Sequence, residues 1–297
     1  MKKVFIVLAI LLVAAGMIVF LSAYIAAGFD FTKLSNVKYE TNTYAPEGEF
    51  RNIEIRTDVS DLVFKPATDG KLSVVCVERE KVRHNVSVEN GTLKIVSEDK
   101  RAWTDFITLF TKNLSVTVYL PEAEYETLKI KNSTGDVELA GYTFGSIDID
   151  NSTGDITLGN VSAGNISLSV STGEISVTSA TCDGEFTLKT STGDVELKDV
   201  TCKRFVSSGS TGDFELTDLI ASESLSIDVS TGDVFFKSCD APQIKVKTST
   251  GDIKGTLRTG KTFSTKTSTG SVKVPKDGMD GTCELKTSTG DISISIG

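Results

Sequence analysis

Apolar and polar positions repeat every 19 or 20 residues from about residue 126 to the end of the chain. With the serine of each Ser-Thr-Gly triplet at position zero, the fifth residue before it and the fourth after it are apolar in every copy. The third before and sixth after are apolar in most copies, so each flank alternates with the period of a half-buried strand. The triplets begin at Ser133, Ser152, Ser171, Ser191, Ser210, Ser230, Ser249, Ser268 and Ser288.

The alternation changes phase at each triplet, because inward positions are odd before the serine and even after it. The chain must therefore turn or bulge there, and glycine allows the positive φ that such a turn needs. A further apolar position near plus nine predicts a third, less regular side. The predicted corner residues are Gly135, Gly154, Gly173, Gly193, Gly212, Gly232, Gly251, Gly270 and Gly290.

Two strands and a looser third side cannot bury their inward residues alone, whereas stacked copies form a continuous hydrophobic column. The sequence therefore predicts an all-β protein, a single-stranded parallel β-solenoid (β-helix) of 19–20-residue coils. Nine coils would rise about 40 Å, and a right-handed coil is expected because right-handed crossovers are strongly preferred.

A long apolar segment opens the chain. Lys2 and Lys3 precede an uncharged run over residues 4–28, which is long enough to cross a bilayer as a transmembrane helix. A cleavable signal has an apolar core of only about 7–15 residues, so a retained signal anchor is favoured, although small residues near its end leave cleavage open. The two lysines and the later Asp30 predict a cytoplasmic N-terminus, a single pass through the cell membrane and an extracellular β domain.

The predicted organisation has four parts: an anchor (1–28), a connector (29–49), irregular N-terminal β coils that also cap the column (50–125), and the repeat solenoid (126–297). Within the third part, residues 59–61 are interpreted as a degenerate corner. Residues 101–111 hold the only tryptophan. They are predicted to plug the end of the core, with an exposed loop that touches the membrane or a partner as the alternative.

The net charge of -9 argues against nucleic acid and anionic lipid as bulk partners. Lysines nevertheless crowd the last third of the chain. They could bind an anionic wall polymer, although a solvated face that resists aggregation is the simpler interpretation. These lysines are Lys245, Lys247, Lys254, Lys261, Lys266, Lys273 and Lys286.

Five cysteines leave at least one unpaired, so the chain is no disulfide framework. Cys182 and Cys202 both lie eleven residues after their serines in consecutive copies. Stacking would place them about one strand spacing apart, within the range a disulfide allows. A disulfide and two buried thiols both remain open.

An acidic residue follows most of the corner glycines. Stacked carboxylates could bind Ca²⁺, but each copy offers only one, so turn stabilisation is the default interpretation. The row comprises Asp136, Asp155, Glu174, Asp194, Asp213, Asp233 and Asp252.

The sequence predicts no enzyme and no catalytic, cofactor or metal-binding residues. It has no phosphate-binding loop, zinc-protease motif, paired Cys-x-x-Cys or nucleophile elbow. The only histidine, His84, stands in a polar stretch and is interpreted as a solvated surface residue without a partner. The fixed spacing also leaves no room for the long loops from which β-helical polysaccharide lyases build their clefts.

The anchor, the irregular segment closing on residues 118–122, and the run 128–136 with its serial copies resemble the bacterial putative adhesin family. This is a domain-of-unknown-function group of cell-surface β-solenoids with LiaX-like relatives, and the resemblance covers nearly all of residues 50–297. It implies a place on the bacterial envelope and a role in adhesion. Through the LiaX-like relatives it implies a role in sensing envelope stress and antimicrobial peptides. No catalytic or ligand residues carry over.

Three functions remain open. The leading one is adhesion, by weak multivalent contacts with wall polymer, glycan or a surface or membrane protein. The second is sensing of envelope stress or antimicrobial peptides. The third is a self-assembling scaffold, because the C-terminal coil over residues 292–297 would leave a bare edge.

Overall fold

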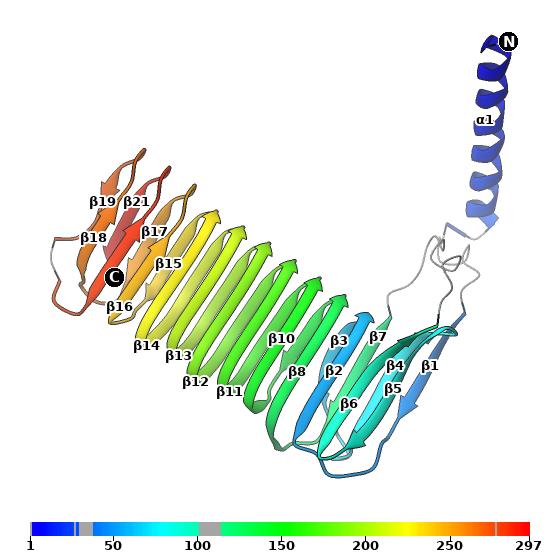
Figure 1. Ribbon diagram of the computed structural model, residues 1–297, viewed down its shortest axis with the longest axis horizontal. Coiled ribbons are helices and arrows are strands. Elements are labelled where there is room, and N and C mark those ends of the chain that lie inside the picture. Colours follow the sequence, from blue (N-terminus) through cyan, green and yellow to red (C-terminus); the bar gives the residue numbers. More distant parts are fainter. Residues whose placement is uncertain (1, 27, 30–37, 101–113, 277) are drawn as a thin grey trace.

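The computed structural model describes residues 2–26, 28–29, 38–100, 114–276 and 278–297. Helix α1 (Lys2–Ala26) lies within the predicted anchor segment. Its stretch Phe5–Ala26 is long and apolar enough to cross a membrane, with a mean hydropathy of 2.9. Figure 1 shows the rest of the chain as one column of stacked strands. The predicted segment 101–111 lies outside the described residues.

The strands have the following bounds. They are β1 (Tyr39–Tyr44), β2 (Asn52–Val59), β3 (Asp61–Pro66), β4 (Ser73–Arg79), β5 (Val82–Glu89), β6 (Thr92–Asp99), β7 (Ser115–Leu120), β8 (Glu124–Thr134), β9 (Val137–Ala140), β10 (Thr143–Thr153), β11 (Ile156–Thr172), β12 (Ile175–Thr192), β13 (Val195–Thr211), β14 (Phe214–Thr231), β15 (Val234–Cys239), β16 (Gln243–Lys247), β17 (Ile253–Leu257), β18 (Thr262–Lys266), β19 (Val272–Lys273), β20 (Thr282–Lys286) and β21 (Ile292–Ile296).

From β8 to β17 the copies stack in sequence order as parallel coils (Figure 1). Equivalent positions of successive copies are register partners, as in the file Ile166, Phe186 and Phe205. These three side chains are at most 1% exposed. The β-solenoid prediction is therefore confirmed, because like residues form continuous files inside one core.

The glycine of each triplet occupies a corner whose backbone conformation other residues rarely adopt. All nine predicted corner glycines have φ between +120° and +150°. At Gly212 a Cβ would lie 2.0 Å from the carbonyl oxygen of Gly193 on the neighbouring coil. The Gly212 N–H donates to Thr231 O on the other side, at 3.0 Å. Glycine is therefore required both by the backbone angle and by the close approach of the next coil.

A second corner, which the sequence analysis missed, lies eight residues after the serine. Five residues with side chains have φ of +51° to +59° there, and Gly141 has φ of +81°. Asn, Asp and Gly tolerate this left-handed conformation best, so the sequence carried a signal for it. The five are Asn160, Ser179, Asp199, Asp218 and Ser238.

The N-terminal end combines coils with an antiparallel cap. Strands β2 and β3 form a level beneath β8 and β9, and Asp61 Oδ1 accepts the Asp136 N–H at 3.1 Å, so residues 59–61 are a corner as predicted. Outside this level lie β6 and β7, parallel to β2 and β3. Strands β4 and β5 then pair antiparallel with β7 and β6, and β1 pairs antiparallel with β4. The opening segment is therefore coils closed by an antiparallel cap, and its levels do not follow sequence order.

The C-terminal end is also out of sequence order, which corrects the expectation of a bare C-terminal coil. Strand β20 pairs with β16 on one side and β18 on the other, and β21 lies between β17 and β19. The Ser268 coil is therefore the outermost one. The inward positions of the Ser268 coil carry less apolar area than those of the Ser288 coil. Thr265 is the register partner of Leu285, and Val272 is the register partner of Ile292. Burying the richer Ser288 coil on both sides removes more apolar surface from water.

Candidate functional site

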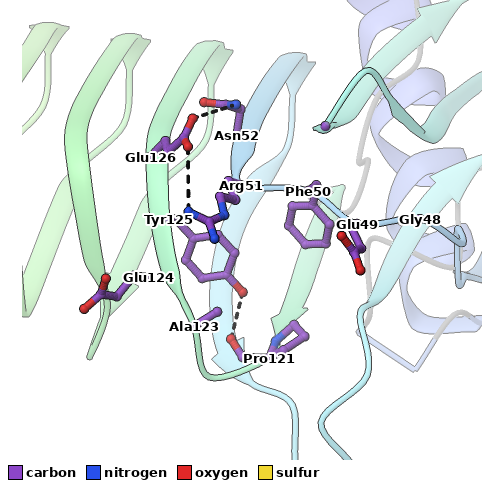
Figure 2. A pocket seen from close by; sticks show the side chains of 11 residues that line it. Gly48, Glu49, Phe50, Arg51, Asn52, Pro121, Ala123, Glu124, Tyr125 and Glu126 are labelled. Atoms are coloured by element: carbon purple, nitrogen blue, oxygen red, sulfur yellow. Dashed lines mark hydrogen bonds and ion pairs between the residues drawn. The ribbon is translucent and has the colours of Figure 1, made fainter.

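An open groove of about 770 Å³ lies beside the first coil, formed by segments 48–52 and 121–126 with Gly91. Figure 2 shows Phe50 and Tyr125 on its floor. Their rings stack with centroids 5.9 Å apart, and the Tyr125 hydroxyl donates to Pro121 O at 2.7 Å. Burial raises the pKa of Tyr125 to about 12, so this phenol stays protonated.

Three glutamates line the same groove. Glu49, Glu124 and Glu126 are exposed, and only Glu126 has a basic neighbour among the described residues, Arg51 Nη1 at 3.9 Å. An aromatic floor with an acidic rim can hold a cationic group that carries apolar carbon. Sequence reasoning missed this groove because its walls come from segments that lie about 70 residues apart.

A file of lysines crosses three coils near the opposite end of the column. Lys247, Lys286 and Lys266 are successive register partners on β16, β20 and β18, and we call them the lysine file. Lys247 Nζ lies 3.2 Å from Asp228 Oδ2, and Lys286 pairs with Glu284. Register partners in neighbouring strands lie about 4.8 Å apart, so the file presents positive charge at a regular interval.

The other lysines of this region do not join the file. Lys254 lies on the strand after its corner and pairs with Asp252 at 2.5 Å. Lys261 is only 1% exposed, and its Nζ lies 2.7 Å from Asp240 Oδ1. The surface role considered for the lysines of this region therefore does not hold for Lys261, because its ammonium is buried in an ion pair.

The acidic row after the corner glycines has a structural role. The Oδ1 of each aspartate accepts the backbone N–H of the acidic residue in the next coil. Examples are Asp155 N to Asp136 Oδ1 at 2.9 Å, and Asp252 N to Asp233 Oδ1 at 2.7 Å. This contact caps an N–H at the corner, as the turn-stabilising interpretation requires.

Cys182 and Cys202 are register partners in adjacent coils, as predicted, and both are buried. The described cysteines are all free thiols, and Cys182 Sγ lies 3.7 Å from Gly164 O. Burial raises the pKa of Cys202 to about 12. The disulfide stays a prediction, which a count of free thiols in denatured protein prepared without reductant would test.

The solvated surface role predicted for His84 is wrong. Its side chain is fully buried in the cap, and Nδ1 lies 2.9 Å from Glu78 Oε1. Residues on the inward face of a strand alternate, and Val82 and His84 share that face of β5. This parity was readable in the sequence, but the polar neighbours of His84 concealed it.

Glu78 is buried as completely as His84. Its Oε2 accepts hydrogen bonds from Asn42 Nδ2 at 2.6 Å and from the Tyr44 hydroxyl at 3.1 Å. Burial alone would raise the pKa of Glu78, but the hydrogen bonds from Asn42 and His84 outweigh it, so the pKa lies below its usual value. A charged carboxylate is thus held inside the cap.

Comparison with known proteins places this architecture. The Toastrack DUF4097 family matches residues 50–183 and 175–297. None of the proteins with curated descriptions matches the sequence. A solved putative adhesin of Bacteroides fragilis is similar at 16% identity over 87% of this chain and 97% of that one, with a TM-score of 0.52.

Two further solved structures show the same likeness. A putative lipid binding protein of Parabacteroides distasonis has 16% identity, covers 88% of this chain and 98% of its own, and has a TM-score of 0.54. A putative adhesin of Parabacteroides merdae has 13% identity, coverage of 88% and 97%, and a TM-score of 0.54. At this identity the likeness concerns the fold.

Proposed function

Because the chain belongs to the Toastrack DUF4097 family, we propose that it is a non-enzymatic bacterial surface protein whose solenoid binds an anionic polymer of the envelope. In this proposal α1 anchors it in the cell membrane, with the N-terminus in the cytoplasm and the column outside. Two similar solved structures are described as putative adhesins, which supports a binding role. The lysine file is the observation that carries the choice of ligand.

The lysine file suits a repeating polyanion better than a small ligand. Its three lysines are register partners in neighbouring strands, so their Cα positions recur at a regular interval along the column. Each contact with a phosphate or carboxylate would be weak alone, but a polymer can engage several at once. Binding should therefore weaken steeply as salt is added.

The test reverses the charge of the file. The triple substitution Lys247→Glu, Lys266→Glu and Lys286→Glu should weaken binding of the purified protein to isolated cell walls at low salt. Three exposed contacts of about 0.5 kcal/mol each correspond to a loss of roughly tenfold in affinity. Unchanged affinity would rule out the file as the binding surface.

The matched control changes the same net charge elsewhere. Lys129, Lys131 and Lys189 are exposed on the same face of the column but in other coils. Reversing these three should leave wall binding close to that of the unaltered protein. If both triple variants lose binding equally, the attraction follows net charge and no defined site.

The groove favours a second candidate function, the sensing of cationic peptides. Its acidic rim and the Phe50 ring would receive a lysine or arginine side chain of such a peptide. The double substitution Glu49→Lys and Glu124→Lys should abolish binding of a cationic amphipathic peptide, measured by fluorescence anisotropy. Reversal of the lysine file should leave that binding intact.

A further inference from the structure

Three metal-binding side chains converge inside the cap, away from both the groove and the lysine file. Cys76 and Glu78 stand two residues apart on β4, so both face inward, and His84 faces them from β5. One potential ligand atom from each of the three lies within 4.8 Å of the others. The site comes from a hairpin, because β4 and β5 are joined by a tight connection at Arg79 and Val82.

The surroundings resemble the outer shell of a metal site. Glu78 Oε2 accepts hydrogen bonds from Asn42 and Tyr44. Its Oε1 accepts the backbone N–H of His84 at 2.5 Å and lies 2.9 Å from His84 Nδ1. On the far side of the ring, His84 Nε2 lies 3.4 Å from Ser60 Oγ. A metal-bound histidine commonly donates its other ring N–H to an oxygen in this way.

The charges of the three groups also favour a divalent ion. The side chains of Glu78 and His84 are fully buried, and Cys76 is fully buried as well. A thiolate, a carboxylate and a neutral imidazole around a dication sum to zero charge, which a low-dielectric interior tolerates. Without the ion, burial beside the Glu78 carboxylate raises the pKa of the Cys76 thiol to about 12.

We propose that Cys76 Sγ, Glu78 Oε1 and His84 Nδ1 bind a Zn²⁺ ion that fastens the cap hairpin, with the fourth tetrahedral position left to a water molecule. Zinc takes thiolate, imidazole and carboxylate ligands at about 2.0–2.3 Å, which places tetrahedral ligand atoms roughly 3.4 Å apart. The present contact of 2.9 Å between Glu78 and His84 therefore lengthens slightly when the ion replaces the proton between them. Binding releases the Cys76 thiol proton, and the imidazole proton moves from Nδ1 to Nε2, where it faces Ser60.

The first test uses the unaltered full-length chain in detergent. After equilibration with Zn²⁺ and dialysis against metal-free buffer, the protein should retain one zinc per chain and unfold at a higher temperature than chelator-treated protein. With Co²⁺ in place of zinc, the spectrum should show a thiolate-to-cobalt charge-transfer band. Folded protein that retains no zinc would overturn the proposal.

Two variants assign the ligands. Cys76→Ser should remove the charge-transfer band, and His84→Gln should reduce zinc retention at least tenfold. The matched control is Cys239→Ser, because Cys239 is equally buried but lies in β15 in the column. A band that survives in the Cys76 variant would overturn the assignment.

A further measurement on the unaltered chain covers the case in which these variants fail to fold. Zinc should slow the alkylation of Cys76 at least tenfold, as measured by peptide mass spectrometry. The alkylation rates of Cys239 and Cys283 should stay unchanged. Equal protection of all the cysteines would contradict a local site.

Discussion

At the scale of single residues, the corners show how backbone and side chain are matched. Asn151 is buried just before a triplet, and its Nδ2 donates to Gly135 O and Gly154 O at 2.9 Å and 3.0 Å. Thr248 takes the equivalent place in a later coil and donates to Gly232 O at 3.2 Å. At these corners the residue before the serine therefore satisfies a carbonyl that a corner glycine exposes.

The substitution Gly212→Ala tests the steric requirement at a corner. The added Cβ would approach Gly193 O to 2.0 Å at a φ of +143°, so we expect a loss of about 3 kcal/mol or more, measured by urea unfolding. Gly159→Ala is the control, because its Cβ would meet only Ala140 Cβ at 3.5 Å. Equal effects of the two substitutions would contradict this account.

The acidic row, which Asp291 continues through its N–H bond to Asp252 Oδ1, predicts a specific loss of stability in acid. A hydrogen bond from Lys254 and the backbone N–H of Asp291 lower the pKa of Asp252, and the backbone and side chain of Ser271 lower the pKa of Asp291. Because these folded-state pKa values lie below the unfolded value of about 3.9, the stabilisation is complete above that pH. It is lost as the pH falls through the folded values.

Thermal unfolding between pH 5 and about pH 2 would measure this loss. Asp291→Asn keeps an oxygen acceptor but cannot titrate, so its unfolding temperature should fall less steeply with acid. Asp148→Asn serves as the control, because Asp148 is exposed and lies outside the acidic row. Identical acid profiles for Asp291→Asn and the unaltered chain would contradict the prediction.

At the scale of elements, repetition predicted the column but not the order of its ends. The triplets fix which positions face inward, so every stacked copy has the same register, and the files in β10–β17 follow. Identical corners fit each other in any order, however, so periodicity cannot say which copy lies beside which. The sequence signal for the reversed order of the last two coils was the polar Thr265 at the inward position where the other coil has Leu285.

The candidate sites were not visible in the sequence for a related reason. The lysine file depends on the reversed order of the last two coils. Lys286 lies between Lys247 and Lys266 only when the Ser288 coil lies inside the Ser268 coil. The cluster of Cys76, Glu78 and His84 in the cap depends on the antiparallel pairing of β4 and β5 with later strands. No sequence repeat specifies that pairing. What the sequence did offer was the inward parity of His84 and Glu78.

Amide hydrogen exchange tests directly whether the Ser288 coil lies inside the Ser268 coil. Amides of β20 lie between two strands, whereas β18 has a neighbour on one side only among the described strands. We therefore expect slower exchange in residues 282–286 than in residues 262–266, by at least tenfold. Protection that declines steadily along the sequence would instead indicate stacking in chain order.

At the scale of the whole molecule, the column presents its outermost coil as an exposed edge. Strand β19 is only two residues long, and Lys266 and Lys273 lie on this coil. Short edge strands and lysines are the features by which proteins discourage edge-to-edge pairing. The edge therefore argues against the self-assembling scaffold.

We accordingly expect a monomer. Light scattering of the detergent-solubilised chain should give a mass that does not change with protein concentration. Substituting Lys266 and Lys273 with threonine, which favours strands and carries no charge, should promote association. Concentration-dependent growth of the unaltered protein would revive the scaffold function.

Interleaving of levels has a consequence for wear. The outermost level at the C-terminal tip, β18–β19, connects through the chain on both sides to the deeper strands β17 and β20. In a repeat protein a terminal unit packs against one neighbour only. Here the chain also fastens that unit to inner coils at both of its ends, so durability in a protease-rich setting follows from the order in which the coils are threaded.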